Sequence, residues 1–159
     1  MQLGELKFSV LLFGLLQTLR VMARRHPAYA KRLAERNLTA QIRTADNKVA
    51  RHFTFRDGRV TSGRGIHPSA DITVTVQNAD LGVKLFSLHV DHLERIEAIK
   101  NFQLQAEGPD ELMVWFMQTL GMIFTLGWEY GTDLGDGVKR YVTNTNGGPL
   151  FVHVKDGRI

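Results

Sequence analysis

The sequence predicts an α+β fold in which a mostly antiparallel sheet is covered by helices. Three observations predict it. Apolar residues recur at helical spacing before residue 37, alternate with polar residues between 38 and 77, and cover nearly the whole circumference of a helix after Pro109. The 159 residues, 43% hydrophobic and 23% charged, have the size and composition of a globular domain.

The N-terminal segment from about Gly4 to Arg25 has apolar residues three and four apart, which predicts a helix with one buried face. Pro27 is suited to begin a further helix that ends near Asn37. The uncharged part, Phe8 to Leu19, is shorter than the roughly 20 apolar residues of a spanning helix, and no signal-peptide cleavage pattern follows. We therefore expect a cytoplasmic protein with at most peripheral membrane contact.

The basic residues concentrate in this N-terminal region, within a net charge of +4. They are typical of a solvated helix face, with an anionic membrane or nucleic acid as the alternatives. Nucleic acid is the less favoured partner, because no aromatic residues interleave with the basic ones. The residues are Arg20, Arg24, Arg25, Lys31, Arg32 and Arg36.

Strands follow from Leu38. Alternation over 38–43 and 52–55 around the Asp46-Asn47 turn predicts a hairpin, and a short return strand runs through Val60. The segment Asp71 to Gln77 alternates most regularly, so Ile72, Val74 and Val76 are expected to point inward together.

Two short helices are predicted next, the first opened by Asp80 and the second by a capping box of Asp91 and Glu94. A strand then ends at Gly108-Pro109, where another helix begins. In this strand Phe102, Leu104 and Ala106 alternate with Gln103 and Gln105.

The helix from Pro109 to Leu126 is apolar on nearly every side. One face of a sheet cannot cover so much apolar area. We therefore expect the helix to be a core helix, an oligomer contact or the wall of a lipid pocket.

Residues 127–159 form a Gly-rich tail that predicts a hairpin of strands Val138 to Thr143 and Leu150 to Val154. We place a domain boundary here, with domains 1–126 and 127–159. The final Asp156-Gly157 turn has no strand to follow it, which looks like a cut end.

The order of elements resembles the sterol-carrier-protein family of lipid-binding domains over about residues 38–124. The best-matching segments are Ala70-Asp-Ile-Thr-Val-Thr-Val, Asn78-Ala-Asp-Leu and Phe102-Gln-Leu-Gln-Ala-Glu-Gly with the helix that follows. The resemblance implies a five-stranded sheet covered by helices. It also implies a protein that binds or carries a lipid, fatty acyl chain or sterol-like molecule without catalysis or a cofactor.

The resemblance places the ligand between the sheet and the helices. The positions matched to its lining are Leu85, Phe86, Leu104, Trp115, Phe116, Leu120 and Ile123. Burial of one methylene contributes about 0.8 kcal/mol, so a dozen offer on the order of 10 kcal/mol before the costs of binding. The aromatic residues of the late helix could also fill this space themselves.

The tail, from Gly147-Gly-Pro-Leu-Phe-Val-His-Val-Lys-Asp-Gly-Arg-Ile, resembles the opening hairpin of molybdopterin-dependent oxidoreductases. The alternative function is therefore an accessory or assembly module of such an enzyme, without a ligand of its own. In this case a redox-enzyme partner or a homodimer would cover the late helix.

Other candidate chemistry is weaker. His89 and His92 could share a helix face but lack further metal ligands, so we expect no metal site. The acidic residues Glu107, Asp110 and Glu111 are explained by the start of a helix. Without cysteine, disulfides, cysteine zinc sites and thiol catalysis are excluded.

Overall fold

The computed structural model describes residues 2–87, 92–129, 132–145, 148–156 and 158. The chain divides into two compact units, residues 1–119 and 120–159, and each is described by itself. Residue 126, where the sequence analysis places a domain boundary, lies in the second unit's part of a continuous helix.

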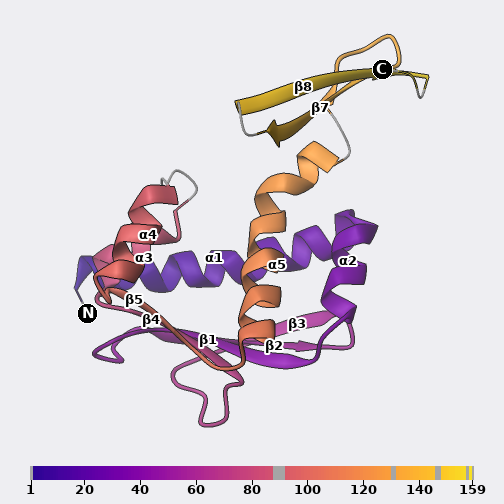
Figure 1. The fold of residues 1–159 in the computed structure, drawn as a ribbon. Coiled ribbons are helices and arrows are strands. Elements are labelled where there is room, and N and C mark those ends of the chain that lie inside the picture. The colour runs from indigo at the N-terminus through magenta and orange to yellow at the C-terminus, as the bar shows by residue number, and fades with distance from the viewer. Residues whose placement is uncertain (1, 88–91, 130–131, 146–147, 157, 159) are drawn as a thin grey trace. The chain divides into compact units, whose positions relative to one another are not determined.

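The first unit contains a five-stranded sheet with the order β3-β2-β1-β4-β5 (Figure 1). β1 pairs in parallel with β4, and the other neighbours are antiparallel, which confirms the mostly antiparallel sheet. The strands are β1 (Leu38–Thr44), β2 (Ala50–Arg56), β3 (Arg59–Arg64), β4 (Ile72–Val76) and β5 (Leu104–Glu107).

The helices of this unit cover one face of the sheet, and the other face is open in Figure 1. α2 begins at Pro27 as expected. α3 begins at Ala79 with Asn78 as its N-cap, whereas the sequence analysis opens it with Asp80. The expected cap Asp91 of α4 lies outside the described residues. The helices are α1 (Leu3–Arg25), α2 (Pro27–Ala34), α3 (Ala79–Leu85), α4 (His92–Lys100) and the first part of α5 (Asp110–Glu129).

The core lies between the sheet and α1. β4 alternates as expected, with Ile72, Val74 and Val76 all buried on the face that packs against the helices. α1 buries the stripe Phe8, Leu12, Leu16 and Leu19. These periodicities of two and about 3.6 residues explain why the elements form this layer.

α1 is longer than its uncharged segment. Its 23 residues make it, within the described part of the chain, the one helix that could cross a membrane by length and composition. The core helix of a soluble protein and a signal sequence near the N-terminus pass the same test. α1 contributes four buried side chains to the core, and 22% of its apolar window is buried.

The prediction that Phe102 belongs to the strand is wrong. Phe102 lies in a turn before β5 with a φ of 55° and is 78% exposed. β5 therefore begins only at Leu104, which is half-buried, and Ala106 is exposed. The alternation of apolar and glutamine residues suits an edge strand, but α4 ends so close to β5 that the chain must reverse at Phe102.

The second unit contains the sheet β6-β7-β8 and confirms the predicted hairpin. Its strands are β6 (Thr132–Asp133), β7 (Val138–Thr145) and β8 (Gly148–Lys155). β7 and β8 pair antiparallel from Val138↔Lys155 to Thr145↔Gly148. Gly135 and Gly137 adopt positive φ in the turn before β7, which favours glycine. Residues 146–147, the expected hairpin turn, lie outside the described residues.

Candidate functional site

An aromatic cluster joins the first part of α5 to the sheet. Phe55 of β2 lies with its ring centroid 5.3 Å from that of Trp115 and 6.1 Å from that of Phe116, both in edge-on geometry. All three side chains are buried. Such edge-on pairs contribute beyond their buried area, so this cluster holds the inner face of α5 on the sheet.

Polar contacts fix the same part of α5 to α2. The guanidinium of Arg32 lies 5.3 Å from the ring centroid of Trp115 and donates hydrogen bonds to the Trp115 carbonyl and to Oε1 of Gln118. The Trp115 indole in turn donates to Glu35 Oε2 at 3.3 Å, and Glu35 is paired with Arg32 at 2.7 Å. Arg32, expected on a solvated helix face, is therefore a structural residue.

A buried hydrogen bond lies beside this pair. The Tyr29 hydroxyl donates to the Thr119 carbonyl at 3.0 Å, and the Thr119 hydroxyl donates to the carbonyl of Trp115 at 2.7 Å. Burial raises the pKa of the Tyr29 hydroxyl well above its ordinary value, and the nearby Arg32 opposes part of this effect. Tyr29 therefore stays a neutral donor throughout the physiological pH range.

The first part of α5 is held from one side. Among the described residues, the hydrogen bonds and ion pairs that its side chains and carbonyls between 110 and 119 make with other elements all go to residues 29–36. On its outward side Val114 is 54% and Met117 43% exposed. The expectation that one sheet face cannot cover this helix is confirmed for these residues.

The two predicted lining residues on α3 lie near the N-terminal half of α1. Leu85 is 3% exposed, and the ring centroid of Phe86 lies 6.1 Å from that of Phe8. α3 approaches α1 closely at Gly82, where an added Cβ would lie 2.6 Å from the Phe8 ring. Glycine therefore allows this close helix contact, and a larger residue would have to displace the Phe8 ring.

The predicted lining residues thus fall into separate groups. Trp115 and Phe116 meet on Phe55, Phe86 meets Phe8, and Leu104 lies on β5 opposite Val76. The rest of the predicted lining on α5, Leu120 and Ile123, belongs to the second unit.

Arg51 is a feature that the sequence analysis missed. It has the same parity on β2 as Phe53 and Phe55, so its side chain faces the helices, and it is only 5% exposed. Its Nη1 donates to Ser62 Oγ at 2.9 Å, and its guanidinium lies 5.5 Å from the ring centroid of Phe13. The signal in the sequence is an arginine at an inward position of the alternating segment Arg51-His-Phe-Thr-Phe.

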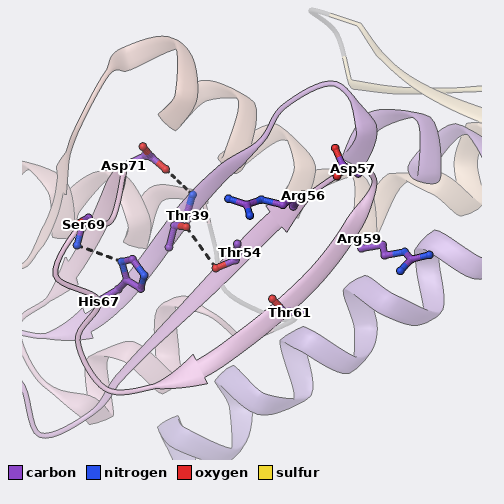
Figure 2. A pocket seen from close by; sticks show the side chains of 9 residues that line it. All are labelled: Thr39, Thr54, Arg56, Asp57, Arg59, Thr61, His67, Ser69 and Asp71. Carbon is purple, nitrogen blue, oxygen red and sulfur yellow. Dashed lines mark hydrogen bonds between the residues drawn. The ribbon is translucent and has the colours of Figure 1, made fainter.

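The open face of the sheet carries a polar pocket of about 890 Å³ (Figure 2). Thr39, Thr54 and Thr61 lie in register on three neighbouring strands, and Asp71 Oδ2 accepts a hydrogen bond from the Thr39 amide at 2.6 Å. The sequence analysis did not predict this pocket, because the pairing register of the strands brings its residues together. Its lining is Thr39, Thr54, Arg56, Asp57, Arg59, Thr61, His67, Ser69 and Asp71.

The weaker chemical candidates gain no support. His89 and Asp91 lie outside the described residues, as does the side chain of His92. Glu107, Asp110 and Glu111 are exposed at the start of α5, and Glu111 is 3.7 Å from Arg36. Within the described part of the chain no three histidine or acidic side chains gather as metal ligands would.

Solved structures share this fold. The match to a UbiJ-SCP2 ubiquinone synthesis protein has a TM-score of 0.50 at 18% identity and covers 69% of this chain and 92% of that one. A candidate sterol carrier protein from Thermus thermophilus matches at 0.45 and 15% identity, covering 78% of this chain and 91% of that one. The match at a TM-score of 0.50 shows that the chain contains a sterol-carrier-protein-like fold.

An enzyme also contains a similar region. A stereoselective inverting sec-alkylsulfatase from Pseudomonas sp. matches with a TM-score of 0.43 and 22% identity. The match covers 58% of this chain, which spans only 14% of the sulfatase. No protein-family model and no curated protein matches the chain. The resemblance of the tail to molybdopterin enzymes stays a prediction.

Proposed function

We propose that this chain binds a hydrophobic ligand, such as a lipid, fatty acyl chain or sterol-like molecule, between the sheet and its helices and catalyses no reaction. The sterol-carrier-protein-like fold, which the chain shares with a UbiJ-SCP2 ubiquinone synthesis protein, supports a lipid-carrier type of domain. The structure contributes an independent argument, which concerns how α5 is held.

The observation that carries the proposal is the one-sided attachment of α5. Its inner aromatic residues Trp115 and Phe116 contact Phe55. Among the described residues, the polar contacts that positions 110–119 make with other elements go to residues 29–36. The outward side, with Val114 and Met117, has solvent as its neighbour. A helix tied along one edge can move away from the sheet without breaking its polar contacts.

In this proposal the ligand replaces the contacts of Trp115 and Phe116 with Phe55. An acyl chain takes the place of Phe55 as the apolar neighbour of each ring. Burial of each of its methylenes contributes about 0.8 kcal/mol. The proposed wall keeps the predicted positions of the first unit, which are Leu85, Phe86, Leu104, Trp115 and Phe116.

The test is to purify the chain from cells, record native mass spectra and extract the protein with organic solvent. We expect a co-purifying lipid that the extraction releases. A protein of bare mass that also takes up no lipid when incubated with a mixed lipid extract would contradict the proposal.

A matched variant decides which face of α5 contacts the ligand. Val114→Gln with Met117→Gln changes only exposed positions and should leave lipid recovery unchanged. If this variant instead loses the lipid while remaining folded, the ligand lies on the outward face and the proposed wall is wrong.

A further inference from the structure

The polar pocket on the open face of the sheet has no part in the proposed function. Thr54 and Arg56, which line it, alternate along β2 with the buried Phe53 and Phe55, so they project away from the helices (Figure 2). Its volume of about 890 Å³ has room for a small molecule. Hydroxyl, guanidinium, imidazole and carboxylate groups line it, and none of its described lining residues is apolar. The pocket therefore suits a hydrophilic ligand.

Two arginines lie side by side at one end of this pocket. Arg56 and Arg59 are register partners on either side of the Asp57-Gly58 turn. Opposite residues of an antiparallel pair have Cβ atoms about 5 Å apart on one face, where like charges destabilise the sheet. In the described part of the chain neither guanidinium has a hydrogen bond or an ion pair, and Asp57 accepts from Asn37 instead. An anion between the two would relieve the repulsion and use their donors.

A row of hydroxyl groups crosses the sheet next to the arginine pair. This threonine row consists of Thr39, Thr54 and Thr61, which are register partners on β1, β2 and β3. Thr54 and Thr61 each lie two residues from an arginine of the pair, so the strand rise places the row roughly 7 Å from it. A hydroxyl both donates and accepts hydrogen bonds, as the 3.4 Å contact between Thr39 and Thr54 requires of one of them. The row therefore suits the hydroxyls of a ligand.

The segment between β3 and β4 supplies the opposite wall of the pocket. In Figure 2 its residues His67, Ser69 and Asp71 lie on the other side of Thr39 from Arg59. The Ser69 amide donates to His67 Nδ1 at 3.2 Å, so the neutral imidazole carries its proton on Nε2 and keeps a donor. Asp71 Oδ2 accepts from the Thr39 amide, and Oδ1 has no partner among the described residues. This wall repels a bare anion and suits hydroxyl groups.

We propose that this pocket binds a phosphorylated polyol, with its phosphate between Arg56 and Arg59 and its hydroxyls on the threonine row and Asp71. The planar fork of arginine binds a phosphate through two parallel hydrogen bonds, which accounts for the arginine pair. The carboxylate of Asp71 accepts from ligand hydroxyls, which accounts for an acid in a pocket for an anion. The pocket lies on the opposite face of the sheet from the proposed lipid wall, so this inference goes beyond the proposed function and does not depend on it.

The same chemistry occurs in free inositol monophosphate and in the head group of phosphatidylinositol, and two experiments on the full chain distinguish these sources. In the first, the ¹⁵N-labelled protein is titrated with inositol monophosphate and followed by NMR, with inositol and inorganic phosphate as controls. In the second, the protein is sedimented with phosphatidylcholine vesicles that contain or lack phosphatidylinositol. Binding in the first experiment alone identifies a soluble ligand, and binding in the second alone identifies a lipid head group.

The NMR titration also locates the ligand. We expect inositol monophosphate to shift the amide signals of Thr39, Thr54 and Thr61 and to bind at least about tenfold more tightly than either control, because it alone contacts both the arginine pair and the hydroxyl groups. The inference is overturned if neither inositol monophosphate nor the phosphatidylinositol vesicles bind. It is also overturned if inorganic phosphate binds as tightly as inositol monophosphate, or if the shifted signals belong to the helices.

Two arginines of β3 provide a matched pair of variants. Arg59→Met removes an exposed charge that lines the pocket and should weaken binding of the inositol phosphate group at least about tenfold. Arg64→Met removes an exposed charge from the same strand, five residues away and outside the lining, and should leave the affinity within about twofold. Equal losses in the two variants would show a general effect of positive charge and would overturn the assignment to this pocket. Arg59→Met should also leave lipid recovery unchanged, because the proposed lipid wall is on the other face.

Discussion

The hydroxyl of Tyr29 donates a hydrogen bond to the backbone carbonyl of Thr119 across 3.0 Å, between two residues with no exposed surface. The bond joins α2 to α5 at the point where the neighbouring Trp115 and Phe116 contact the sheet. This bond is therefore one of the contacts with α2 that, in the proposed function, keep α5 attached when a ligand enters.

Replacement of this donor should loosen that edge. Tyr29→Phe keeps the ring and removes the hydroxyl, so we expect a loss of about 1 kcal/mol in the free energy of unfolding, measured by urea denaturation. The pH dependence gives a specific control. The folded state raises the pKa of Tyr29, so its contribution is fully present below about pH 10 and is lost as the pH rises above that value. The gap between the two proteins should therefore narrow above pH 10, and a gap that widens there would contradict the assignment.

The contact between α1 and α3 depends on Gly82. Gly82→Ala places a methyl group about 2.6–2.7 Å from atoms of the Phe8 ring, which has no exposed surface. We expect overpacking to outweigh the better helix propensity of alanine and to cost about 1–2 kcal/mol in thermal or chemical unfolding.

Gly14→Ala is the matched control for this substitution. Gly14 also lies in a helix, but an added Cβ meets nothing within 4 Å. The helix propensity of alanine should then stabilise the protein by up to about 1 kcal/mol. Equal effects of the two substitutions would show that the helices do not approach at Gly82.

Phe102 carries backbone strain that asparagine should relieve. It is 78% exposed with a φ of 55°, a conformation that costs an ordinary residue about 1–2 kcal/mol and that asparagine tolerates better. We expect Phe102→Asn to raise the free energy of unfolding by up to about 1 kcal/mol. A clear loss of stability would instead show that Phe102 is covered in solution.

The sequence predicts the order of the elements well, because helices and strands bury their apolar residues with different periods. It does not predict that β1 lies between β2 and β4 or that it pairs in parallel with β4, since alternation within one strand carries no information about its neighbour. The pattern at Phe102 misleads for a related reason. Phe102 continues the alternation of apolar and glutamine residues that is typical of a strand, whereas the end of α4 determines where β5 begins.

The candidate site is less readable from the sequence. Trp115 and Phe116 stand out as apolar residues, but their partner Phe55 comes from a strand 60 residues earlier in the sequence. The polar pocket needs three threonines in register, which only the pairing of strands determines. The inward position of Arg51 could have been predicted, because it is two and four residues from Phe53 and Phe55 in an alternating segment. Its lack of a carboxylate partner among the described residues is visible only in three dimensions.

The most direct test of a ligand between the sheet and α5 uses Trp115 as a reporter. The chain has a second tryptophan, so Trp128→Phe leaves Trp115 as the source of indole fluorescence. Titration with dibrominated stearate, whose bromine atoms quench only at contact, should lower the Trp115 emission to a plateau near one ligand per chain. Emission that stays unchanged while calorimetry records binding of the same ligand would contradict the account.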